Sequence, residues 1–100
     1  MNHYNLNGNR YRIVYTDDIP GDENKELAGL CDPPDKRDKT IYIRQSIPLH
    51  MLIDTLIHEG LHSCLWCLAE DTVEQVATDL SKMLIKELGI EKAPASPSED

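Results

Sequence analysis

The chain has 100 residues and is acidic, with 18 Asp and Glu residues against 10 Lys and Arg residues and a net charge of −8. This length predicts a single domain, and the negative charge argues against nucleic acid or an anionic membrane surface as a partner. The apolar stretches are too short to cross a bilayer, the N-terminus has no export signal, and three cysteines make no disulfide framework, so we expect a cytoplasmic protein.

The first half of the chain predicts a small sheet. Residues 4–16 alternate polar and apolar side chains around Asn7-Gly8, a pair that favours a tight hairpin turn. Pro20-Gly21 marks a turn in an acidic loop. Residues 27–31 form a short candidate strand, and residues 40–44 form a second one, which a polar loop joins to the first as a hairpin. These elements predict a small antiparallel N-terminal sheet.

An apolar helix is predicted after this sheet. Residues 49–57 contain no glycine or proline and are apolar enough for a buried helix. Ser46 is a good N-cap, and Pro48 would then fall in the first turn, where its missing N–H costs little. The helix continues into His58-Glu59-Gly60-Leu61-His62, an H-E-x-x-H motif.

This motif predicts a catalytic zinc site. Two histidines four apart on a helix lie on one face, roughly 6 Å apart along the axis, and both can reach one zinc ion with Zn–N bonds of about 2.0–2.1 Å. Glu59 lies between His58 and His62, where it could take a proton from a zinc-bound water. The alternative is two histidines held by hydrogen bonds in an apolar core, and that would need two polar partners on one apolar helix.

Cys64 and Cys67 form a C-x-x-C pair directly after the motif. A zinc site of that type needs a second pair, which the sequence lacks, and a redox site needs its own βαβ context. We therefore expect both cysteines to be small buried apolar side chains, with a redox role as the alternative.

A second, amphipathic helix is predicted after residue 71, ending at Gly89. Its apolar stripe is Val73, Val76, Ala77, Leu80, Met83, Leu84 and Leu88. The remaining residues, 93–100, contain no core-forming side chains and predict a disordered tail. The fold expected is thus α+β, with the small antiparallel sheet, the metal-binding helix and the amphipathic helix in one domain of residues 1–92.

A catalytic zinc usually has three protein ligands, so one protein ligand besides the two histidines must come from elsewhere in the chain. The second helix must turn back on the first to bury its stripe, which brings its first turns near His62. Glu74, at the edge of the stripe beside Ala77, is the predicted third ligand, and Glu70 is the alternative. A third possibility is that Asp71 caps the helix and Glu74 only completes a capping box. Asp54, four residues before His58, is better placed to orient a ligand than to bind the metal.

These residues resemble a known family. Residues 54–62, followed by residues 70–77, resemble the small zincin-like metallopeptidases often encoded by phages and prophages, minimal relatives in style of the SprT-like and gluzincin groups. Residues 29–32 and 40–44 also look like the β-portion of that family, so the resemblance covers about residues 11–90. It implies a zinc-dependent peptidase with a minimal zincin-like fold.

The resemblance implies His58, His62 and a downstream glutamate as zinc ligands, with Glu59 as the general base. Gluzincins take that glutamate from a helix that reads E-x-x-A followed by Asn or Asp. Here residues 74–77 keep the glutamate and the alanine, but Thr78 comes next. Asp79 and Asp54 are therefore both candidates for the carboxylate that orients a ligand.

Two classes of function follow. The first is a zinc metallohydrolase, most simply a peptidase acting on a peptide or protein, in which Glu59 activates the zinc-bound water. The second is a non-enzymatic, zinc-stabilised domain that binds a partner; Glu59 favours the first, because a structural site has no use for a base. If the chain is a peptidase, we expect residues 40–44 at the sheet edge beside the cleft, where an extended peptide could add as a strand.

Overall fold

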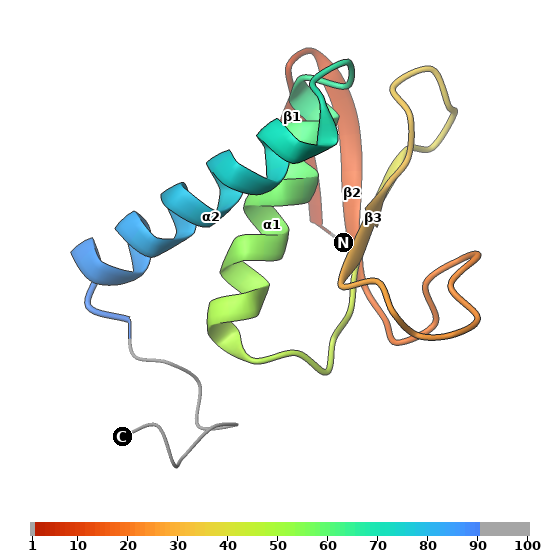
Figure 1. The fold of residues 1–100 in the computed structure, drawn as a ribbon. Coiled ribbons are helices and arrows are strands. Elements are labelled where there is room, and N and C mark those ends of the chain that lie inside the picture. The colour runs from red at the N-terminus through yellow and green to blue at the C-terminus, as the bar shows by residue number, and fades with distance from the viewer. Residues whose placement is uncertain (1, 91–100) are drawn as a thin grey trace.

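The computed structural model describes residues 2–90 and confirms the α+β class. The predicted tail, residues 93–100, and the last two residues of the predicted domain lie outside the described residues. A sheet forms one layer, α1 packs against this sheet, and α2 packs against α1 (Figure 1). The elements in chain order are β1 (Asn2–Leu6), β2 (Asn9–Tyr15), β3 (Gly29–Cys31), β4 (Thr40–Ile43), α1 (Leu49–Cys64) and α2 (Glu70–Glu87).

The sheet has four strands in the order β1-β2-β4-β3. The hairpin predicted at Asn7-Gly8 joins β1 to β2, and both turn residues have positive φ angles, 53° and 84°, as a tight hairpin turn of this type requires. The hairpin between β3 and β4 is also confirmed. The prediction of an antiparallel sheet is wrong, however, because β2 and β4 pair in parallel, with Arg12 opposite Thr40. After β2 the chain crosses to the far edge, forms β3 and returns as β4 between β2 and β3.

Strand β4 lies inside the sheet, paired with β2 on one side and β3 on the other. The prediction that it is an edge strand able to accept a peptide is therefore wrong. Its central position agrees with its burial, since Thr40, Ile41 and Ile43 are all buried. The edge next to β4 belongs to the short strand β3, which packs against α1.

The core lies between the sheet and α1. Its fully enclosed part is Tyr11, Cys31, Ile41 and Ile43, which come from three strands. Partly buried apolar side chains complete this core: Leu6, Ile13, Ile47, Leu52 and Leu56. Because Leu52 and Leu56 come from α1, the same packing that forms the core fixes the helix that carries the H-E-x-x-H motif. Among residues 2–90 no helix is both long and apolar enough to cross a membrane.

Helix α1 begins two residues later than a cap at Ser46 would place it. Pro48 occupies the N-cap position, with no side-chain cap bond, and its carbonyl accepts the amide of Leu52. The hydroxyl of Ser46 instead donates to the carboxylate of Asp17 at 2.7 Å. The predicted cap is thus wrong, because Ser46 finds a tertiary partner.

Helix α2 begins at Glu70 with Ala69 at the N-cap. Asp71 lies inside the first turn, so the interpretation of Asp71 and Glu74 as a capping box is wrong. The end at Gly89 is confirmed: its φ is 67°, its amide donates to the Lys86 carbonyl, and the amide of Ile90 donates to the Ile85 carbonyl. This is the Schellman arrangement, which satisfies the last carbonyls of a helix.

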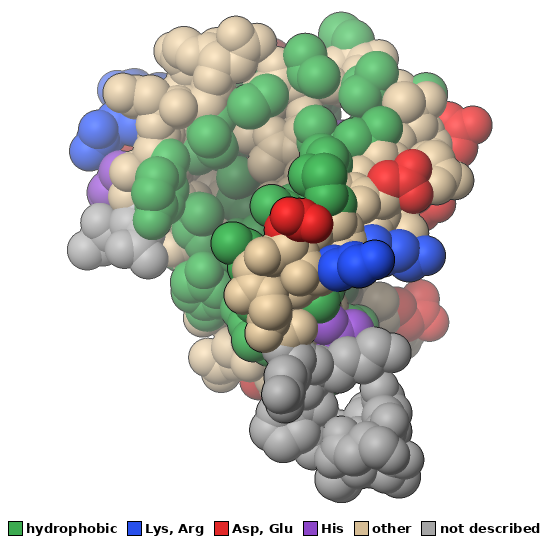
Figure 2. All heavy atoms as spheres, turned by 90° about the vertical axis from the view of Figure 1, so that its left-hand side faces the viewer, with side chains coloured by type: hydrophobic (Ala, Val, Ile, Leu, Met, Phe, Trp, Pro, Cys, Tyr) green, Lys and Arg blue, Asp and Glu red, His purple; other side chains and the backbone are tan. Residues whose placement is uncertain are grey.

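The buried stripe of α2 is narrower than predicted. Val73, Ala77 and Ser81, each four residues apart, are buried. Ala77 and Ser81 are small, which lets the helices approach closely. The predicted stripe residues Leu80, Met83 and Leu88 are exposed instead. Hydrophobic side chains gather on the face of the molecule that Figure 2 shows.

Candidate metal centre

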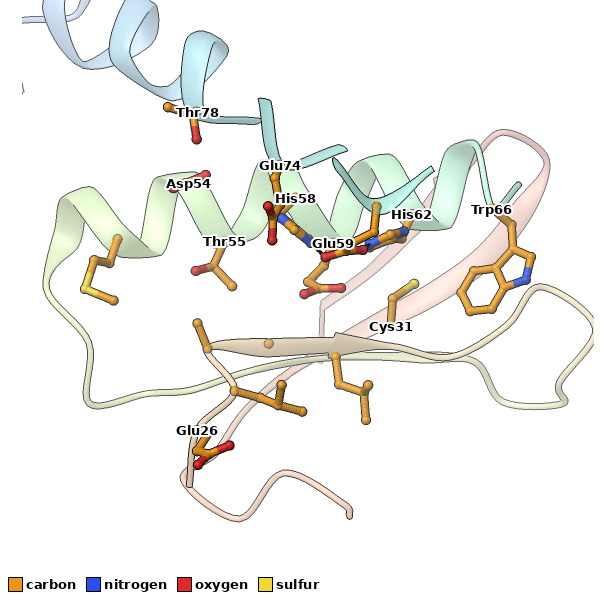
Figure 3. A pocket seen from close by; sticks show the side chains of 16 residues that line it. Glu26, Cys31, Asp54, Thr55, His58, Glu59, His62, Trp66, Glu74 and Thr78 are labelled. Atoms are coloured by element: carbon orange, nitrogen blue, oxygen red, sulfur yellow. Dashed lines mark hydrogen bonds and ion pairs between the residues drawn. The ribbon is translucent and has the colours of Figure 1, made fainter. Parts of the chain in front are cut away.

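The two histidines of the motif lie one turn apart on α1 and face the same cavity. Their ring centroids are 4.9 Å apart, with an angle of 63° between the ring planes. Both side chains are mostly buried, with 20% of His58 and 18% of His62 exposed. Figure 3 shows both rings on the side of α1 that faces the cavity.

Glu70, the first residue of α2, reaches both histidines. Its Oε2 lies 3.1 Å from His58 Nε2 and its Oε1 lies 2.8 Å from His62 Nε2. These three residues form a cluster that could hold a metal ion, with one ligand atom from each lying within 4.8 Å of the others. The turn between the helices makes this contact possible. The amide of Leu65 donates to the Leu61 carbonyl and the amide of Leu68 donates to the Leu65 carbonyl, so the chain reverses direction between α1 and α2.

Glu74 lies one turn further along α2. It is exposed and lines the same cavity, and in the view of Figure 3 it appears next to His58. Among the described residues it is not part of the cluster that His58, His62 and Glu70 form. The structure thus brings together the two predicted histidines with the alternative glutamate. A helix that began after residue 71, as the sequence predicts, would leave Glu70 in the loop, whereas α2 begins at Glu70 and puts it in the first turn.

Glu59 points from α1 toward the sheet, next to Gly29 of β3 (Figure 3). It is 6% exposed and lines the cavity. Burial raises its pKa to about 7; the nearby His58 lowers the pKa and Glu70 raises it. A carboxylate poised near neutrality can both accept and return a proton.

The close approach of Gly29 to Glu59 was not visible from the sequence. A Cβ atom on Gly29 would lie 2.8 Å from Thr55 Cγ2, 3.0 Å from Glu59 Cγ and 3.0 Å from the Tyr42 carbonyl oxygen. Real Cβ atoms essentially never come closer than 3.0 Å to another heavy atom. Strand β3 can therefore lie this close to α1 only because residue 29 has no side chain.

The cavity has a volume of about 640 Å³ and three walls. The first is the inner face of α1, the second is residues 26–31, which lead into and include β3, and the third is the beginning of α2. Trp66 stands at one end, with its ring centroid 6.3 Å from that of His62. The motif thus opens into a space large enough for several atoms of a ligand beside a metal ion.

A buried ion pair holds the second wall in place. Arg44 is 9% exposed and donates to the carbonyls of Leu27 and Asp17, at 2.6 and 2.9 Å, and to the carboxylate of Asp22. Asp22 in turn accepts the amides of Glu26 and Leu27, both at 2.9 Å. The loop that carries the cavity rim is therefore fixed through side chains that the sequence did not single out.

Several other predicted roles are not seen. Asp54 lines the cavity one turn before His58, but among residues 2–90 it makes no hydrogen bond to a histidine. Asp79 accepts from Gln75 Nε2 at 3.0 Å and does not line the cavity. Cys67 is exposed and Cys64 is only partly buried, so the expectation of two buried cysteines is wrong.

Comparisons with protein-family models, with curated proteins and with solved structures found no match for this chain.

Proposed function

We propose that this protein is a zinc-dependent metallohydrolase, most simply a peptidase. One observation carries the proposal: His58 and His62 face one cavity together with Glu59, and a carboxylate from α2 reaches both imidazoles. Two imidazoles and one carboxylate are the ligand set of many catalytic zinc sites. The separation of the candidate ligand atoms, all within 4.8 Å, fits one ion.

His58 and His62 would hold the ion, with a glutamate of α2 as the third ligand. The contacts favour Glu70, and the sequence pattern E-x-x-A favours Glu74. A zinc ion bound there would supply Lewis-acid activation of water and of the scissile carbonyl. Three protein ligands leave a coordination position free for that chemistry.

Glu59 would carry the proton. Its carboxylate would take a proton from the attacking water and pass it to the leaving amine. Its side chain lies on the cavity side of α1, against Gly29 of the sheet. Glu70 is near enough for its charge to raise the pKa of Glu59, so the base would lie close to one of the two candidate ligands.

Metal analysis tests the first half of the proposal. The purified protein should hold close to one zinc per chain after mild dialysis, and His58→Ala or His62→Ala should lose it. His3→Ala is the matched control, because His3 is exposed on β1 and does not line the cavity. Full zinc retention by both motif variants would contradict a zinc site at His58 and His62. Peptide hydrolysis that stops with a chelator and returns with zinc tests the second half.

The alternative function is a zinc-stabilised domain that binds a protein partner. The observation that favours it is the exposed apolar pair Leu65 and Trp66, with 50% and 42% of their surfaces exposed, in the turn beside the site. Under this alternative, chelation would lower the melting temperature, and no peptide would be cleaved with or without zinc.

A further inference from the structure

Most of the ionisable side chains that line the cavity beside the motif are carboxylates. Among the described residues its ionisable lining consists of two histidines, five carboxylates and the Cys31 thiol, and it includes no lysine or arginine. The carboxylates are Glu26, Asp54, Glu59, Glu70 and Glu74. The proposed function uses Glu59 and one glutamate of α2. The other glutamate of α2, together with Glu26 and Asp54, has no role in that chemistry.

These remaining carboxylates are not neutralised by neighbours. Among residues 2–90 no lysine or arginine lies within ion-pair distance of Glu26, Asp54 or Glu74; the lysines and arginines that form ion pairs do so elsewhere. A concave surface with uncompensated carboxylates attracts cations more strongly than a flat surface does. Asp54 and Thr78 also line the adjoining groove, whose other lining residues include Lys82 and Lys86.

The two ends of the cavity differ in character. Asp54, His58, His62 and Trp66 follow one another at intervals of four residues, so they run along one side of α1 and the turn after it. Figure 3 shows Asp54 and Trp66 on opposite sides of the histidines; Glu26 lies toward the Asp54 end, but across β3 from Asp54. One end is therefore acidic, and the other end carries a half-exposed indole ring.

We propose that this cavity selects extended peptides that carry a lysine or arginine on one side of the cleaved bond and a large apolar side chain on the other. The basic side chain would lie beside Asp54, and the apolar one against Trp66. The inference rests on the proposed function for the position of the cleaved bond, but the binding preference can be measured without any cleavage.

The test is a titration of zinc-loaded Glu59→Gln with fluorescein-labelled decapeptide pools. Two pools carry Lys and Arg in one half and Trp and Leu in the other, in the two possible orders, and two matched pools carry Asp and Glu in place of Lys and Arg. The better basic pool should bind at least about tenfold more tightly than either acidic pool at low salt. Asp54→Asn should reduce this ratio severalfold, and Trp66→Ala should weaken binding of the basic pools.

Asp35→Asn is the charge-matched control, because Asp35 is exposed and does not line the cavity. It should leave the ratio nearly unchanged. Equal binding of basic and acidic pools, or equal effects of Asp54→Asn and Asp35→Asn, would overturn the inference. Cleavage of neutral peptides by the parent without any preference would also overturn it and leave the proposed function standing. A clear binding preference without zinc-dependent cleavage would contradict the proposed hydrolase activity and support the inferred peptide preference.

Discussion

Glu59 lies directly against the backbone of Gly29, and the absence of a side chain at Gly29 is what allows this contact. The contact joins the helix that carries the motif to the edge strand of the sheet. A methyl group on Gly29 would meet Glu59 Cγ at 3.0 Å and Thr55 Cγ2 at 2.8 Å. Either β3 or the Glu59 side chain would have to move.

We therefore expect Gly29→Ala to destabilise the protein and to displace Glu59. Overpacking of this kind costs about 1–3 kcal/mol of the free energy of unfolding, measurable by urea denaturation. Gly60→Ala is the matched control: a Cβ there meets no atom within 4 Å, and alanine is favoured over glycine inside a helix by about 1 kcal/mol. A Gly29→Ala variant as stable as the parent would contradict the close packing.

The third zinc ligand can be assigned by a pair of variants. If the contacts of Glu70 with His58 and His62 mark the ligand, Glu70→Ala should lower zinc affinity by more than about 100-fold, beyond what the loss of a residue that only orients a ligand costs. Glu74→Ala should then have a small effect. Competition with a chromophoric chelator gives both affinities. The opposite order would assign the ligand to Glu74, as the sequence pattern predicts.

The stability of the protein should fall in acid partly because of Asp22. Burial raises the pKa of Asp22, but hydrogen bonds from the amides of Leu27 and Glu26, with the charges of Arg44 and Lys25, outweigh burial and hold this pKa below its ordinary value. A depressed pKa in the folded state adds stability above the unfolded pKa, about 3.9. That stability is lost as the pH falls through the folded value.

The melting temperature of the parent should therefore drop more steeply between about pH 5 and pH 3 than that of Asp22→Asn, which has no proton to bind at this position. Asp22→Asn should also melt lower at pH 7, since Arg44 loses its buried partner. Glu23→Gln, an exposed neighbour, controls for the loss of one carboxylate. Parallel pH profiles for the parent and Asp22→Asn would contradict the role of this ion pair.

The local parts of the fold could be predicted from the sequence. The hairpin at Asn7-Gly8 and the end of α2 at Gly89 depend on residues that tolerate positive φ angles. Such residues can be recognised from a few adjacent positions in the sequence. The placement of His58 and His62 on one helix face is local in the same sense. Helix periodicity alone puts them side by side.

The non-local parts could not be predicted. The parallel pairing of β2 with β4 depends on a crossover of the chain, which alternation of side chains does not encode. Ser46 is a good capping residue by type, but Asp17, far away in sequence, competes for its hydroxyl. The proximity of Glu70 to the histidines depends on the turn at residues 65–69, and the contact of Gly29 with Glu59 depends on how closely sheet and helix approach.

The central claim is that Glu59 moves the proton in a zinc-dependent hydrolysis, and Glu59→Gln tests it most directly. Glutamine keeps the size and hydrogen-bonding capacity of the side chain but cannot act as a base at neutral pH. Against an unbiased peptide library, Glu59→Gln should bind zinc and melt like the parent, yet cleave at least about 100-fold more slowly, the low end of what a general base contributes. Cleavage by the parent that continues unchanged in Glu59→Gln would contradict the account.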